Sequence, residues 1–250
     1  MTMTEPTGTE PTGTEPTVTV ADRLALALDV DDLAVALELA RRLRPWFAVA
    51  KVGLELFGAA GPEAVVALQA SGYRVFLDLK LHDIPTTVGR AAGVLGRMGV
   101  AYATVHTQGG RAMVEAAVES MAAGAAGAGV PSPCVLGVTV LTSDPEASTG
   151  VLAARAALAA AAGCGGLVCA ASDLAATRGA APGLTTVVPG IRPSGTEPDD
   201  QARASTPTMA IAAGADLLVV GRAVTGAADP ESAAVALTHE VESALGARSA

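Results

Sequence analysis

The sequence predicts an α/β fold, a (β/α)8 barrel in a single domain, and three observations carry this prediction. Short apolar runs alternate with longer alanine-rich segments, the pattern of βαβ units around a parallel sheet. Eight such runs occur, each followed by a helical pattern, and the 250 residues match the usual size of one barrel. Half of the residues are hydrophobic but only 2% are aromatic, which suits a barrel filled by aliphatic side chains and wrapped by alanine-rich helices.

The expected strands are short apolar runs bounded by glycine or polar residues. In chain order they span residues 24–29, 47–52, 74–79, 102–106, 134–140, 166–170, 185–188 and 217–220. The expected helices are longer segments with apolar residues at helical spacing. They span residues 32–43, 61–71, 86–98, 110–122, 151–162, 172–179, 207–213 and 230–245.

A dinucleotide-binding sheet is the main alternative architecture, and the first strand argues against it. Such a sheet needs fewer strands and a glycine-rich fingerprint directly after the first one. Here the chain continues Leu-Asp-Val-Asp-Asp at 28–32, without that fingerprint. The barrel is therefore the favoured reading.

Residues 1–17 form a tail, and 18–250 are expected to be the catalytic barrel domain. The tail repeats Thr-Glu-Pro-Thr-Gly at 4–17 and offers no apolar side chain for burial. It is expected to be disordered, as a solvated extension or, alternatively, a recognition segment.

Charge and cysteine usage restrict the partners and the compartment. Sixteen Lys and Arg against 25 Asp and Glu give a net charge of −9, which disfavours nucleic-acid binding but leaves a small anionic ligand open. Three cysteines form neither a disulfide framework nor a metal knuckle. No signal peptide or membrane-spanning run is evident, so we expect a cytoplasmic protein without membrane contact.

Polar residues at the strand ends are the candidate functional residues, because chemistry in such barrels lies at the carboxyl ends of the strands. In chain order they are Asp29, Lys51, Asp78 and Lys80, Asp83, His106, Thr142 and Ser143, Arg192, Gly221 and Arg222.

The third strand carries the most informative pair. Asp78 and Lys80 lie two residues apart, so strand alternation places both side chains inside the barrel and the flanking leucines toward the helices. Alone, such a pair also has a purely structural explanation. Asp29 and Lys51 end the two preceding strands at equivalent depth, so four ionisable groups are expected to converge, which favours a functional site.

Several segments resemble one known family, the orotidine 5′-phosphate decarboxylases, in their bacterial type 1 branch. The most specific segment is Asp-Leu-Lys-Leu-His-Asp-Ile-Pro-Thr-Thr at 78–87. Shorter matching segments lie at 26–29, 51–57, 188–192 and 219–222, and the resemblance runs from about residue 24 to the last helix. It implies an enzyme that converts orotidine 5′-monophosphate to uridine 5′-monophosphate, the last step of de novo pyrimidine synthesis.

The resemblance implies four catalytic residues. Lys80 matches the lysine that protonates C6 of the pyrimidine, and Asp78 the carboxylate set against the substrate carboxylate. Lys51 matches a lysine that joins this array and the ribose hydroxyls. Asp83 matches an aspartate that reaches into the neighbouring subunit's site, so a homodimer with shared sites is implied.

Further positions match substrate-binding residues of the family. Asp29 matches a ribose-binding aspartate and Thr142 a nucleotide-binding position, with Ser143 beside it as a candidate for the pyrimidine edge. Thr87 is also expected to bind substrate. The residues that would hold the nucleotide, chiefly its phosphate, are Arg192, Gln201, Gly221 and Arg222.

The implied chemistry is expected to need no cofactor and no metal. Losing CO₂ from a ring carbon without an adjacent carbonyl leaves a localised carbanion, and no thiamine, pyridoxal or metal motif is visible to stabilise it. Fixed charges must then do so: the Lys80 ammonium stabilises the carbanion, whereas Asp78 disfavours the ground-state carboxylate.

Two other functions stay open. A magnesium-dependent sugar-phosphate decarboxylase or aldolase of the same superfamily would share Asp78, Lys80 and Asp83, but is expected to carry an acidic residue in place of Lys51. A catalytically silent nucleotide-binding barrel is expected to lack one of the four charged residues.

Two smaller features also allow two readings. His106 contacts substrate or is a hydrogen-bonded structural histidine, and segment 194–200 is a lid over the site or an ordinary loop.

Overall fold

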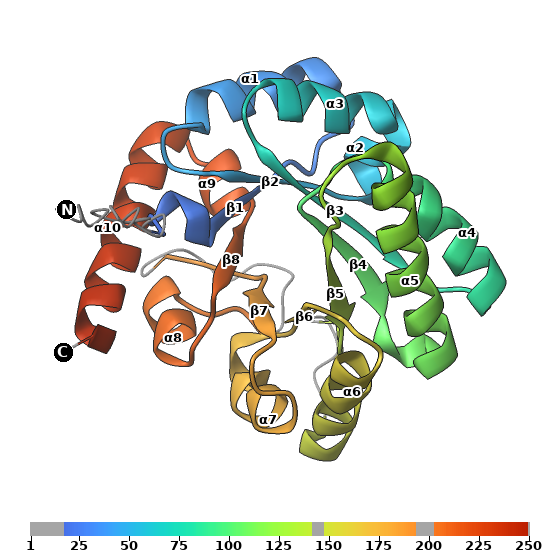
Figure 1. Ribbon diagram of the computed structural model, residues 1–250. Helices are drawn as coiled ribbons and strands as arrows, with labels where there is room; N and C mark the ends of the chain where they lie inside the picture. The colour runs from blue at the N-terminus through green and yellow to red at the C-terminus, as the bar shows by residue number, and fades with distance from the viewer. Residues whose placement is uncertain (1–17, 142–147, 194–202, 250) are drawn as a thin grey trace, which may run out of the picture.

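The computed structural model describes residues 18–141, 148–193 and 203–249, which form a closed ring of eight parallel strands surrounded by helices (Figure 1). Each strand pairs with the next along the chain, and β8 pairs with β1. The strands are β1 (Leu24–Ala27), β2 (Val49–Val52), β3 (Arg74–Leu81), β4 (Tyr102–His106), β5 (Cys134–Val138), β6 (Gly166–Val168), β7 (Thr185–Val188) and β8 (Leu217–Val220). The predicted (β/α)8 barrel is confirmed; the tail at 1–17 lies outside the described residues.

Helices follow each strand and cover the outside of the barrel (Figure 1). Two of them, α2 and α9, were not among the predicted helices. The α-helices are α1 (Leu33–Leu43), α2 (Leu54–Ala60), α3 (Pro62–Ala70), α4 (Pro85–Gly96), α5 (Arg111–Ala128), α6 (Thr149–Ala161), α7 (Leu174–Ala180), α8 (Pro207–Ala212), α9 (Arg222–Thr225) and α10 (Pro230–Ser249).

Short polar side chains begin several helices. The Asp32 carboxylate accepts hydrogen bonds from the backbone N–H groups of Ala34 and Val35 at the start of α1. Ser148 caps α6 in the same way, and Thr206 caps α8 directly before a proline at the first helical position. Such caps satisfy backbone donors that have no partner inside the helix.

The core has two layers, as expected for a filled barrel. The inner layer lies inside the ring of strands and includes Ala25, Val49, Phe76, Leu136, Val187 and Leu217. The outer layer lies between strands and helices, where Leu77 and the other strand residues of opposite orientation are buried. Glycines bring α4 and α5 very close together: a Cβ on Gly96 would collide with the backbone of Met121, and a Cβ on Gly124 with that of Gly93.

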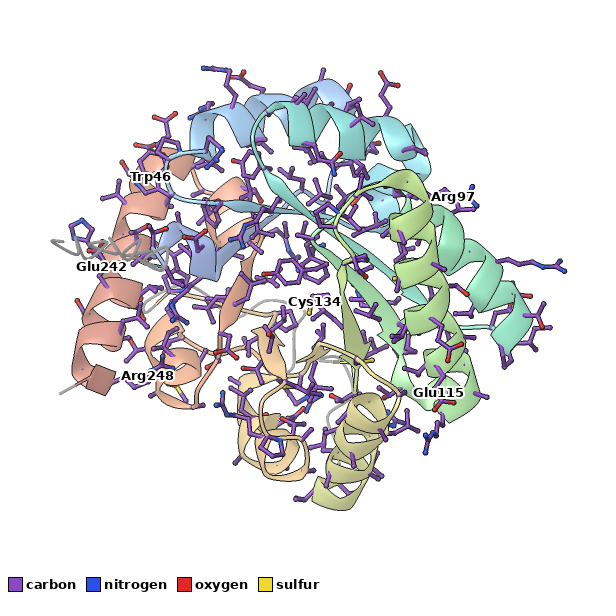
Figure 2. All side chains as sticks on the ribbon, in the orientation of Figure 1. Trp46, Arg97, Glu115, Cys134, Glu242 and Arg248 are labelled. Atoms are coloured by element: carbon purple, nitrogen blue, oxygen red, sulfur yellow. The ribbon has the colours of Figure 1, made fainter. Side chains whose placement is uncertain are left out.

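Three of the few large aromatic residues lie at the amino ends of strands. Trp46 precedes β2, Tyr73 precedes β3, and Tyr102 opens β4. The Tyr73 hydroxyl donates a hydrogen bond to the carbonyl of Ala40, 2.7 Å away, and Trp46 lies at the outer edge of the molecule (Figure 2). These rings are therefore at the end of the barrel opposite to the carboxyl ends of the strands.

Among the described helices, none has both the length and the apolar character that crossing a membrane requires.

Candidate active site

Strand β3 is irregular where it carries its charged residues. Its ladder with β4 pairs Leu77 with Ala103 and Leu81 with Val105, so residues 78–80 all lie opposite Thr104. Lys80 has φ +50°, the only positive φ of a non-glycine residue in the described ranges. The predicted strand ended at residue 79, and its extension to Leu81 includes this bulge. Bulges of this kind redirect side chains and are common beside active sites.

The four charged residues expected to converge do so at the carboxyl ends of β1, β2 and β3. Lys51 Nζ lies 2.8 Å from Asp29 Oδ1 and 4.0 Å from Asp78 Oδ2. Lys80 Nζ lies 2.7 Å from the same Asp78 oxygen. Carboxylate and ammonium groups thus alternate along one line: Asp29, Lys51, Asp78, Lys80.

Burial along this line is uneven. The side chains of Lys51 and Asp78 are only 10% and 11% exposed, whereas that of Asp29 is 52% exposed. Water screens charges less effectively in a buried position. The interactions of Asp78 are therefore stronger than those of an ordinary surface carboxylate, while Asp29 faces the open mouth.

These residues line a cavity of about 480 Å³, within the usual range for small-molecule sites. Its apolar wall comes from the strand ends and includes Val138, Val168, Cys169 and Val219. Burial raises the pKa of the Cys169 thiol to about 12, so this wall stays uncharged. Among the described residues, the charged lining comprises four cations and three carboxylates: Lys51, Lys80, Arg192 and Arg222, and Asp29, Glu55 and Asp78.

Other predicted residues fall into three groups. Arg192, Gly221 and Arg222 line the cavity. Asp83 and Thr87 are exposed and lie outside the lining of this chain's cavity, and the Asp83 carboxylate accepts a hydrogen bond from the N–H of Ile84. Thr142, Ser143, Gln201 and the candidate lid at 194–200 lie outside the described residues.

His106 lies beside the charged line and not in the cavity lining. Its ring centroid is 5.3 Å from that of His82, and its Nδ1 has no hydrogen-bond partner within the described part of the chain. Burial, followed by the charges of His82 and Lys80, lowers the pKa of His106. His106 does not line the cavity, so both roles expected from the sequence, a substrate contact or a structural histidine, stay predictions.

Arg203 joins three segments at the mouth. Its Nη1 lies 2.7 and 2.6 Å from the two carboxylate oxygens of Asp173, which ends the short 3-10 helix η3 (Ala171–Asp173) after β6. Its Nη2 donates to the carbonyl of Leu141, 2.8 Å away, beyond the end of β5. One guanidinium therefore holds together the segments that follow β5, β6 and β7.

Glu55 and Thr225 also line the cavity but were not predicted as site residues. Each belongs to a short helix, α2 or α9, that the sequence patterns did not reveal. Thr104 was also not predicted as a site residue. It lies two residues before His106 on β4, so strand alternation predicts that both side chains face the barrel interior. A polar side chain at such a position could have indicated the site.

A closed parallel barrel with a charged cavity at its carboxyl end defines this protein as a (β/α)8-barrel enzyme. A family model described as "Orotidine 5'-phosphate decarboxylase / HUMPS family" matches residues 22–237. The chain belongs to that family, so the resemblance noted in the sequence is confirmed.

Individual relatives match over most of their length. An orotidine 5′-phosphate decarboxylase of Moorella thermoacetica is 45% identical over 233 residues, covering 88% of this chain and 92% of the relative. One from Anaeromyxobacter sp. (strain K) is 48% identical over 231 residues, covering 87% and 97%. A crystal structure of orotidine 5′-phosphate decarboxylase from Lactobacillus acidophilus superposes with a TM-score of 0.71 at 32% identity, covering 87% of this chain and 98% of that one.

Proposed function

We propose that this enzyme decarboxylates orotidine 5′-monophosphate to uridine 5′-monophosphate without a cofactor. The observation that carries the proposal is the alternating line of Asp29, Lys51, Asp78 and Lys80, held within 2.7–4.0 Å contacts in one cavity. Family membership and the names of the relatives support the same reaction.

The catalytic step breaks the bond between C6 and the carboxylate, and the electron pair stays on C6. The Lys80 ammonium lies next to Asp78 at the cavity wall, where it stabilises that negative charge and then donates a proton from Nζ to C6. The buried carboxylate of Asp78 repels the substrate carboxylate more strongly than the neutral CO₂ that leaves. Both effects lower the activation barrier to decarboxylation, and neither requires the carbanion to be delocalised.

The remaining cavity residues bind the nucleotide. Asp29 and Lys51, after β1 and on β2, bind the ribose hydroxyls, and Arg192, Gly221 and Arg222, from the segments after β7 and β8, hold the phosphate. We assign Thr142, Ser143 and Gln201 to the same binding set from the sequence. Phosphate binding far from C6 lowers the chemical barrier when its binding energy orders the site around the reacting ring.

We further propose a homodimer in which each subunit supplies Asp83 to its partner's site, and we keep Thr87 among the substrate-binding residues. Both residues are exposed and lie just beyond Lys80, at the mouth of the barrel, yet do not line their own cavity. A second copy of the chain provides the surface that would make Asp83 part of a site.

Loss of orotidine 5′-monophosphate absorbance tests the reaction directly. We expect wild-type turnover and a loss of at least about 10³-fold in the Lys80→Ala variant, since that change removes the charge and the proton donor together. Equal, negligible rates for both proteins would leave the silent nucleotide-binding barrel as the better reading.

The magnesium-dependent alternative is tested in the same assay. We expect full activity with excess EDTA. A strict requirement for added Mg²⁺ would instead favour a sugar-phosphate lyase of the same superfamily.

A further inference from the structure

Thr104 is a buried residue of β4 whose hydroxyl contacts two of the charged residues at once. The residue is 1% exposed. Its Oγ1 accepts a hydrogen bond from the backbone N–H of Lys80, 2.9 Å away, and donates one to Asp78 Oδ1, 3.0 Å away. A single hydroxyl therefore connects the backbone of one charged residue with the carboxylate of the other.

The backbone at Lys80 depends on this contact because the β-ladder is interrupted there. Residues 78–80 lie opposite Thr104 alone, and Lys80 takes the left-handed φ of +50° that side chains disfavour. The Thr104 hydroxyl supplies an acceptor for the Lys80 N–H within the bulge. A buried N–H without such an acceptor would destabilise this conformation.

The carboxylate of Asp78 is fixed by the same hydroxyl. Its Oδ2 receives Lys80 Nζ at 2.7 Å and faces Lys51 Nζ at 4.0 Å, while its Oδ1 receives the Thr104 hydroxyl. Removing the hydroxyl leaves Oδ1 without this donor and frees the carboxylate to rotate. The geometry of both charged side chains in the cavity then changes.

We propose that Thr104 is a positioning residue, whose hydroxyl holds the Asp78 carboxylate and the Lys80 backbone in their reactive arrangement. This inference rests on the proposed decarboxylation for its kinetic consequence. The placement of the two groups by Thr104 is a separate physical claim, which can be measured without any turnover.

Thr104→Val removes the hydroxyl and keeps a β-branched side chain suited to a strand, whereas Thr104→Ser keeps the hydroxyl. We expect kcat to fall about 10- to 100-fold in the valine variant, the effect of losing a hydrogen bond to a charged group, and to change less than about threefold in the serine variant. The KM and the Kd for uridine 5′-monophosphate should stay close to wild type, because the phosphate and ribose contacts lie elsewhere.

Amide hydrogen exchange at Lys80 supplies the readout that does not depend on activity. The Lys80 N–H should be protected in wild type and in Thr104→Ser and should exchange faster in Thr104→Val, while amides of β7 keep their protection. A wild-type kcat in the valine variant, equal losses in both variants, or unchanged Lys80 exchange would overturn the inference. Absence of turnover in wild type would refute the proposed function instead, and the exchange result would still decide whether Thr104 holds Lys80.

Discussion

Arg203 binds both carboxylate oxygens of Asp173 through a single guanidinium nitrogen, and the two side chains are only 13% and 6% exposed. The pair connects residues that lie 30 positions apart in the sequence. Because both charges are buried, loss of one partner leaves the other as an unpaired charge in a poorly solvated position.

We therefore expect Asp173→Ala to lower the free energy of unfolding by about 3 kcal/mol. Replacing both residues, Asp173→Leu with Arg203→Met, should recover most of this loss, because no charge is then left unpaired. Urea unfolding measures both effects. Glu38→Ala is the control, because it breaks the exposed Glu38–Arg41 pair and should change stability little. A loss no larger than in the control would contradict this account of the buried pair.

The close contact of α4 and α5 predicts opposite effects for two substitutions in one helix. In Gly124→Ala the new methyl group would collide with the backbone of Gly93, so we expect a loss of roughly 1–3 kcal/mol. At Gly127 a methyl group meets nothing within 4 Å, and Gly127→Ala should stabilise the protein by up to about 1 kcal/mol through helix propensity. Denaturant midpoints test the pair, and changes of the same sign would be inconsistent with it.

His106 predicts a decline in stability toward acidic pH. Burial and the nearby charges of His82 and Lys80 lower its pKa in the folded protein, whereas the unfolded chain binds a proton near pH 6.5. As the pH falls below about 6.5, the unfolded state gains the proton first and stability decreases until the pH reaches the lowered pKa. Between pH 7.5 and 5.5, the free energy of unfolding of the His106→Gln variant should therefore decrease less than that of the wild type. Urea titrations at both pH values measure this difference. Parallel losses would assign the decline to other groups.

The proposed shared site predicts complementation between two inactive variants. Lys80→Ala and Asp83→Asn each disable every site of their own dimers, but a mixed dimer has one site with both wild-type residues. Mixing them under conditions of subunit exchange should restore activity, up to about a quarter of the wild-type level when exchange is complete and random. Mass spectrometry verifies the mixed dimer. No recovery from verified mixed dimers would mean that Asp83 acts within its own subunit.

The barrel could be predicted from the sequence because alternation of apolar runs and helical patterns is a local signal. The bounds of β4, β7 and β8 agree with the predicted ranges. The convergence of Asp29, Lys51, Asp78 and Lys80 was also predictable, since the carboxyl ends of neighbouring parallel strands meet at one edge.

Features that depend on contacts between distant segments were not predictable. The bulge in β3 is defined by its pairing with β4, and strand alternation alone does not reveal the left-handed backbone of Lys80. The Arg203–Asp173 pair joins segments whose separation in the sequence carries no periodic signal. The short helices α2 and α9 have too few residues for a recognisable helical pattern.

The position of Trp46 has a spectroscopic consequence. It is the only tryptophan of the chain, half-buried at the end of the barrel away from the cavity. Its fluorescence should therefore report unfolding of the barrel with little interference from nucleotides at the mouth. With one tryptophan and two tyrosines, the protein also absorbs weakly in the near ultraviolet, so the optical signal of a pyrimidine substrate can be followed at high enzyme concentration.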